Sequence, residues 1–221
     1  MQSPDTHNVT IAAGLTNPIN AGQVIFRRTL KAMSEPGTIV DIEHNHGAGD
    51  LSPAMYALAL SLLDQQTTLY LSAALKNEEV CKNLQFHTDV QLVNDPQSAM
   101  FAIANADQIT EFCYFNKGTD ESPEMSCSLV LQVESLTNTA AQAQGSDNEH
   151  STLLKLEGPG IESVKYIAIA KLSTQLLEYL TERPDAFPRG LDFYFVSDKQ
   201  LVCLPRTTKV SVITTGDNPC M

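Results

Sequence analysis

The amino-acid sequence predicts a single α/β domain in which a mixed central sheet is flanked by helices on both faces. Strand-like and helix-like segments alternate in the first half of the chain, as in layered α/β proteins. Strand-like segments dominate the second half and end in a hairpin around Asp198-Lys199, so the sheet cannot be wholly parallel. We see neither a repeat nor a linker in the 221 residues. We expect one domain over residues 18–214, with a polar lead-in at 1–17 and a polar tail at 215–221.

Two helices are expected before residue 65. Asn20 is the expected cap of the first, whose apolar residues follow helical spacing as far as Met33 and which stops at Pro36-Gly37. Ser52-Pro53 begins the second, with the serine as cap and the proline at the first helical position. This second helix is apolar nearly all round, which indicates burial on most of its sides.

Two more helices and a series of strands complete the prediction. Asn77 caps a short helix that is expected to end at Leu84, and a helix from Ser173 to Arg183 carries a leucine face. A helical turn is expected over residues 107–112, and a loop or hairpin tip over 140–150. The expected strands share apolar or β-branched composition and cover residues 38–42, 67–71, 100–104, 128–133, 152–156, 164–170, 193–196, 201–204 and 210–213.

Composition and charge exclude several classes of function. The net charge of −12 and the pI near 4.7 give the chain no general attraction for nucleic acid or anionic lipid. No apolar run approaches the roughly 20 residues that span a bilayer. The five cysteines are odd in number and include no Cys-x-x-Cys pair, so buried thiols in a reducing compartment are the plain interpretation. We therefore expect a cytoplasmic protein that binds neither nucleic acid nor membrane.

The end of the last hairpin carries a candidate anion-binding group. Arg206, followed by Thr207 and Thr208, is able to form a fork for phosphate or carboxylate. The alternative is that Arg206 pairs with Asp192 across the hairpin, and the sequence does not favour one over the other.

Other candidate groups have simpler explanations. Gly158-Pro159-Gly160 is more typical of a tight turn than of an anion site, because the proline removes one donor. Arg27 and Arg28 indicate a solvated helix face or a subunit contact. His44 and His46 lack an identifiable third metal ligand, so a surface loop is favoured. Standard motifs for nucleophilic, phosphate-loop, dinucleotide or zinc-protease chemistry are missing from the sequence.

Two further residues have no evident partner in the sequence. His87, between Phe86 and Thr88, is better explained as a hydrogen-bonded structural histidine than as a general base. Asp64 follows the end of the second helix, where a carboxylate is disfavoured, so it needs another reason to be there.

A series of short motifs resembles one family, the H subunit of the bacterial carbon–phosphorus lyase system (PhnH). Each motif is weak alone, and their order over most of the chain makes the set specific. The motifs are Phe26-Arg27-x-x-x-x-Ala32-Met33-x-x-Pro36-Gly37, Leu62-Leu63-Asp64, Phe86-His87-Thr88, Gly118-Thr119-x-x-x-Pro123-Glu124-x-Ser126, Gly158-Pro159-Gly160-Ile161, Phe187-Pro188-x-Gly190-x-Asp192 and Leu204-Pro205-Arg206-Thr207-Thr208. The chain departs from the family at Arg189 and over residues 140–150.

The resemblance implies a role in using phosphonates as a phosphorus source. In that family the H subunit works with subunits G, I, J and L, and the G–H–I–L group transfers the ribose triphosphate of ATP to an alkylphosphonate with release of adenine. Catalysis is usually assigned to the I subunit. The family fold resembles the large domain of pyridoxal-phosphate transferases. Neither Lys165 nor Lys171 has a recognisable Schiff-base setting here, so no cofactor is expected.

The leading hypothesis is a non-catalytic interaction subunit that forms a homodimer in isolation. The alternatives are a stand-alone enzyme with a phosphate pocket at Arg206, Thr207 and Thr208, and a homodimeric small-molecule binder. If the motifs form one site, we expect Arg27, Asp64, Asp192 and Arg206 to converge. The candidate binding or interface residues are Arg27, Pro36, Gly37, Asp64, His87, Gly158, Gly160, Asp192, Arg206, Thr207 and Thr208.

Overall fold

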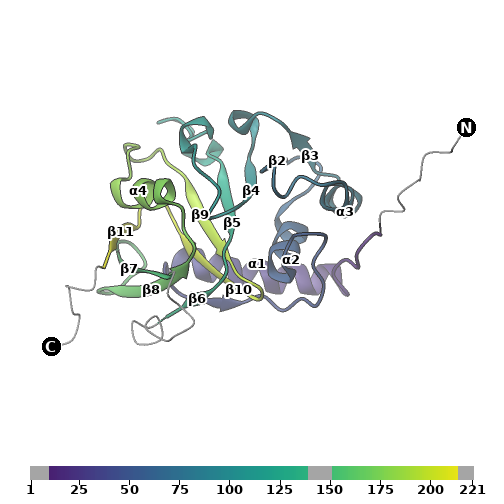
Figure 1. Ribbon diagram of the computed structural model, residues 1–221, viewed down its shortest axis with the longest axis horizontal. Coiled ribbons are helices and arrows are strands. Elements are labelled where there is room, and N and C mark those ends of the chain that lie inside the picture. Colours follow the sequence, from purple (N-terminus) through teal and green to yellow (C-terminus); the bar gives the residue numbers. More distant parts are fainter. Residues whose placement is uncertain (1–9, 139–150, 214–221) are drawn as a thin grey trace, which may run out of the picture.

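Two β-sheets organise the computed structural model, which describes residues 10–138 and 151–213. A seven-stranded sheet has the order β1-β10-β9-β5-β4-β2-β3, and a four-stranded sheet has the order β11-β7-β8-β6 (Figure 1). The helices are α1 (Pro18–Ser34), α2 (Pro53–Leu62), α3 (Glu78–Thr88) and α4 (Thr174–Glu182), with 3₁₀ turns η1 (Pro96–Ser98), η2 (Phe112–Tyr114) and η3 (Pro123–Met125). The strands are β1 (Val40–Asp41), β2 (Thr68–Leu71), β3 (Gln91–Val93), β4 (Phe101–Asn105), β5 (Ser128–Gln132), β6 (Leu136–Thr137), β7 (Ser151–Glu157), β8 (Lys165–Ala170), β9 (Asp192–Val196), β10 (Gln200–Leu204) and β11 (Lys209–Val212).

The seven-stranded sheet is mixed, as predicted. Strands β3, β2, β4, β5 and β9 run parallel, whereas β10 and β1 are antiparallel to their neighbours. The hairpin between β9 and β10 supplies the change of direction, since it pairs Val196 with Leu201. The starts of β4, β5 and β9 therefore share one edge of the sheet with the end of β10.

Alternating side chains divide the interior into two cores. From β5, Leu129 and Leu131 point into one core and Val130 into the other. The first core lies between the seven-stranded sheet, α4 and the four-stranded sheet, and the second lies under α1, α2 and α3 (Figure 1). Helices on both faces of a mixed sheet are thus confirmed.

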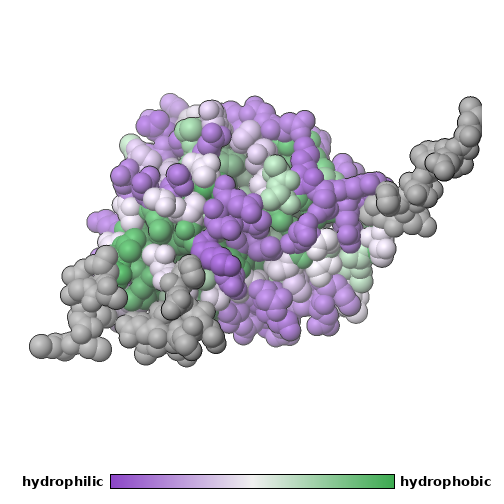
Figure 2. Space-filling view, viewed as in Figure 1, coloured by the Kyte–Doolittle hydropathy of each residue, from purple (hydrophilic) through white to green (hydrophobic). Residues whose placement is uncertain are grey.

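The four-stranded antiparallel sheet is the main feature that the sequence prediction missed. Each of β7, β8 and β11 was predicted as a strand, but as part of one central sheet. Instead they form a second layer, where Leu154, Leu156 and Ile167 cover the first core. On the face drawn in Figure 2, hydrophobic residues gather where Figure 1 draws β7, β8 and β11.

Helix boundaries differ from the prediction at two places. The cap of α1 is Asn17 rather than Asn20, because Pro18 occupies the first turn and the Asn17 side chain accepts the Asn20 N–H. Helix α3 is capped by Asn77 as predicted, but it continues to Thr88 and so includes Phe86 and His87. Within the helical turn predicted over 107–112, the Ile109 N–H donates to the carbonyl of Asn105, and the separate 3₁₀ turn η2 begins at Phe112. The loop predicted over 140–150 lies outside the described residues.

The cysteines are less uniformly buried than predicted. Cys127 and Cys203 are buried, whereas Cys81 is half-buried and Cys113 is exposed. Burial raises the pKa of the Cys127 thiol to about 12. No helix in the part of the chain that the structure describes is long and apolar enough to cross a bilayer.

Ser173 gives a direct test of how α4 is attached. Its hydroxyl accepts the Leu176 N–H at 3.1 Å as an N-cap and donates to the carbonyl of Ile109 at 2.7 Å. Ser173→Ala should lower the free energy of unfolding by about 1–2 kcal/mol, because it leaves a cap donor and a buried acceptor unpaired. Urea denaturation followed by circular dichroism measures this, with the exposed Thr181→Ala as the matched control in the same helix. Equal effects of the two substitutions would contradict the capping role.

Candidate functional site

Arg206 joins its own turn to two other segments, residues 123–126 and 188–192, at the amino edge of the parallel strands. Its Nε and Nη2 groups donate to the two carboxylate oxygens of Asp192, and its backbone N–H donates to Asp192 Oδ1 at 2.8 Å. Nη1 donates to the carbonyls of Pro123 and Pro188 at 2.9 and 3.1 Å, and Nη2 also donates to Ser126 Oγ. These bonds use all five N–H groups of the guanidinium.

The pairing of Arg206 with Asp192 is therefore confirmed, and it leaves the guanidinium no unused N–H group for a phosphate fork. Both side chains are largely buried, with exposed fractions of 15 % and 20 %. The neighbouring residues belong to a turn, in which the Thr208 N–H donates to the carbonyl of Pro205. Thr208 is buried and its hydroxyl has no protein partner, so it does not face solvent as a ligand group.

A second junction brings three predicted motifs together through their backbones. The Gly158-Pro159-Gly160 turn joins β7 to β8 and packs against the end of α1 and the turn before β11. A Cβ on Gly160 would lie 2.2 Å from the carbonyl oxygen of Ser34 and 2.9 Å from Pro36 Cδ. A Cβ on Gly158 would lie 3.0 Å from the carbonyl oxygen of Thr207. The favoured interpretation of this segment as a tight turn is confirmed, and its role is to let three backbones meet.

The same junction contains the end of the first motif. Pro36 and Gly37 are buried beside it. Lys165, which follows the Gly158 turn on β8, donates to Thr38 Oγ1 at 2.6 Å. This contact ties the start of β8 to the segment that follows Gly37.

Arg27, Asp64, Asp192 and Arg206 do not form one cluster. In the described segments no hydrogen bond or ion pair connects Arg27 or Asp64 with the Asp192–Arg206 pair. Asp64 accepts the Gln66 N–H in the turn before β2. In the sheet, β2 lies three strand spacings from β9, the strand of Asp192, so the two strands are about 14 Å apart. Arg27 is exposed on α1. The predicted convergence is correct only for Asp192 and Arg206.

His87 attaches the amino-terminal segment to α3, as expected of a structural histidine. Its Nε2 lies 2.9 Å from the carbonyl oxygen of Ala12, and its ring packs edge-on against Tyr56. The buried Asn83, one turn earlier, accepts the Ala12 N–H at 2.6 Å. The part of the predicted lead-in from residue 10 onward is therefore held on the domain.

The His44–His46 loop borders a hollow of about 380 Å³ together with Glu43 and Lys199. Burial of the ring lowers the pKa of His44, and His46 nearby lowers it further. No group of three metal-ligating side chains occurs among residues 10–138 and 151–213. His44 and His46 lie in a loop, as predicted.

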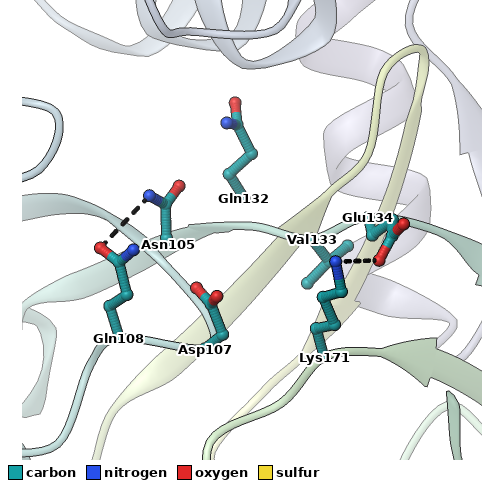
Figure 3. Close-up of a pocket in the computed structure, with 7 residues that line it drawn as sticks. All are labelled: Asn105, Asp107, Gln108, Gln132, Val133, Glu134 and Lys171. Carbon is teal, nitrogen blue, oxygen red and sulfur yellow. Dashed lines mark hydrogen bonds and ion pairs between the residues drawn. The ribbon is translucent and has the colours of Figure 1, made fainter. Parts of the chain in front are cut away.

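A cavity of about 210 Å³ lies at the carboxyl ends of β4 and β5, where no motif was recognised (Figure 3). Asn105 and Gln132 are the last residues of those strands. Polar residues at the carboxyl ends of buried strands are the signal that could have indicated it, since ligands of open α/β sheets bind at this edge. The seven lining residues are Asn105, Asp107, Gln108, Gln132, Val133, Glu134 and Lys171.

The polar groups of this cavity are already partly engaged. Lys171 pairs with Glu134 at 2.8 Å, and this hydrogen bond raises the pKa of Lys171 (Figure 3). Gln132 accepts the Ser52 N–H and donates to the carbonyl of Asp50, which fixes the start of α2. With Asp107, the cavity has two carboxylates for one ammonium group, a charge balance that disfavours a phosphate ligand.

Comparisons with known proteins place these observations in context. Residues 13–211 match the model of the family described as "Bacterial phosphonate metabolism protein (PhnH)". The chain is 30 % identical over 203 residues to "Alpha-D-ribose 1-methylphosphonate 5-triphosphate synthase subunit PhnH" of Rhizobium meliloti, covering 90 % of this chain and 94 % of that protein. It is 23 % identical over 190 residues to "Putative C-P lyase subunit protein HtxG" of Stutzerimonas stutzeri, covering 86 % of each.

Proposed function

Because the chain belongs to the bacterial phosphonate metabolism protein (PhnH) family, we propose that it is a non-catalytic subunit of a carbon–phosphorus lyase system. In this role it supports transfer of the ribose triphosphate of ATP to an alkylphosphonate, with release of adenine. The name of the Rhizobium relative, a subunit of a ribose methylphosphonate triphosphate synthase, supports this reaction.

The observation that carries the proposal is the full engagement of Arg206. A subunit that bound a triphosphate itself would need free donors, and an acidic chain has few to offer. Arg206 was the strongest candidate, and all its N–H groups bond within the chain. The motif residues hold loops and backbones in place, which suits a subunit that presents a rigid surface to others.

The proposed partners are the G, I, J and L subunits, with catalysis on one of them. In their absence we propose a homodimer, which the open edge of β11 supports, since among the described residues β11 pairs only with β7. The proposal requires no cofactor on this chain and no nucleic acid, and it places the protein in the cytoplasm, where ATP is available.

Adenine release is the test. The purified chain is incubated with ATP and methylphosphonate, alone and together with the G, I and L subunits. We expect adenine only from the complete set, and omission of this chain should lower its rate. Adenine release by the chain alone would overturn the proposal in favour of a stand-alone enzyme, and an unchanged rate without the chain would remove its supporting role.

A further inference from the structure

Helix α1 carries large apolar side chains on its solvent-facing side. Ile19, Phe26 and Leu30 have exposed fractions of 74 %, 47 % and 52 %. The buried face of the same helix is formed by Ile25, Thr29 and Ala32, of which two are small or polar. A helix at the surface of a monomer normally has the opposite distribution, with its large apolar residues turned inward. This inversion indicates that the outer face of α1 is covered in the functional assembly.

The spacing of the outer residues specifies the geometry of the partner. The outward-facing residues Ile19, Gln23, Phe26 and Leu30 are separated by four, three and four residues. This is the a/d repeat of a helix that packs along another helix. Figure 1 shows α1 as a long helix along one side of the molecule, beside α2 and β10. We call these four residues the α1 seam.

The charges of α1 specify the chemistry of the partner. Between Pro18 and Ser34 the chain has three basic residues and no acidic one, although the whole chain has a net charge of −12. Arg28 is paired with Glu43 and Lys31 with Glu35. Arg27 borders the seam, is exposed, and makes no hydrogen bond or ion pair within the described ranges 10–138 and 151–213.

A second copy of α1 does not meet these requirements. Two seams packed antiparallel about a two-fold axis near Phe26 would bring Arg27 close to its symmetry mate, and like charges repel. Both copies would also contribute the charge of −12. A different chain with carboxylates beside an apolar helix face satisfies both the seam and Arg27.

We propose that the α1 seam binds an amphipathic helix of another subunit of the complex, whose apolar face is flanked by Asp or Glu. This inference rests on the proposed function and adds the surface through which the chain joins its partners. Phe26 and Leu30 fill the centre of the contact, and Arg27 pairs with a carboxylate at its border.

Co-expression with the tagged G, I, J and L subunits tests the seam. The double substitution Phe26→Glu with Leu30→Glu should weaken binding at least about tenfold, and Arg27→Glu should weaken it less. Phe86→Glu is the matched control, because Phe86 is exposed to 69 % on α3, away from the seam. Circular dichroism checks that each variant is folded, which is expected because the changed side chains face solvent.

A photo-crosslinker identifies the occupant directly. Gln23→p-benzoylphenylalanine places the reactive group within the seam, and mass spectrometry should find it joined to an acidic, amphipathic helix of another subunit. Crosslinking to a second copy of this chain, or full binding by the Phe26/Leu30 variant, would overturn the inference while leaving the proposed function intact. Failure of the wild-type chain to bind any of the four subunits would instead overturn the proposed function.

Discussion

Arg206→Ala is expected to lower the free energy of unfolding by about 3 kcal/mol, the lower end of the range for breaking a buried ion pair. The substitution removes the guanidinium donors of the Asp192 carboxylate, which keeps only the backbone N–H of residue 206, and it leaves the carbonyls of Pro123 and Pro188 without this donor. Because the pair retains some exposure, water compensates for part of the loss. Urea denaturation followed by circular dichroism measures the change.

Arg189→Ala is the matched control for this experiment. Arg189 pairs with Asp120, and both side chains are well exposed. Arg189→Ala should therefore lower the free energy of unfolding by less than about 1 kcal/mol. Arg206→Lys keeps the positive charge but cannot form the fork to Asp192 while also reaching both carbonyls, so most of the loss should remain. If Arg206→Lys were as stable as the wild type, charge alone would explain the role of Arg206.

Gly160→Ala is expected to lower the free energy of unfolding by about 2–4 kcal/mol. Gly160 has a φ of +80°, which disfavours any residue with a Cβ, and the added carbon would lie 2.2 Å from the carbonyl oxygen of Ser34. The turn between β7 and β8 would have to move away from the end of α1. Thermal unfolding followed by circular dichroism at a strand-sensitive wavelength reports the loss.

Gly22→Ala is the matched control, and it should raise the free energy of unfolding rather than lower it. Gly22 lies within α1, and apart from its chain neighbours and the backbone of its own helix, no heavy atom would lie within 4 Å of a Cβ there. Alanine in a helix interior is favoured over glycine by about 0.5–1 kcal/mol. A destabilising Gly22→Ala would show that the method does not separate backbone strain from a general effect of the substitution.

The sequence predicted most elements because their signals are local. Ser52-Pro53 and Ser173 are caps that act within a few residues, and the strands carry β-branched or apolar runs. The cap of α1 was misplaced by three residues because Asn17 and Asn20 are both good caps, and only Pro18 distinguishes them. The motif order also identified the family correctly.

The arrangement of those elements could not be predicted in the same way. Whether β7, β8 and β11 extend the central sheet or form their own depends on contacts between distant residues, such as Leu154 and Val212. From the sequence, the ion pair between Arg206 and Asp192 was one of two alternatives, the other being an anion-binding fork. The distance between the two side chains depends on the register of the hairpin, which the sequence does not give. The cavity at Asn105 and Gln132 has no sequence motif, because it arises where two strand ends become neighbours.

The bonds of Arg206 also determine when during folding its stabilisation becomes available. They connect it with residues 14, 18, 80 and 83 positions away along the chain. The two bonds with the largest sequence separation, to Ser126 and Pro123, cannot form until β5 lies beside β9. Non-local pairing of this kind is slow. Contacts that form after the transition state stabilise a protein mainly by slowing its unfolding. Arg206 should therefore extend the lifetime of the folded chain and leave its folding rate nearly unchanged, which would protect the subunit during the interval between its synthesis and its assembly.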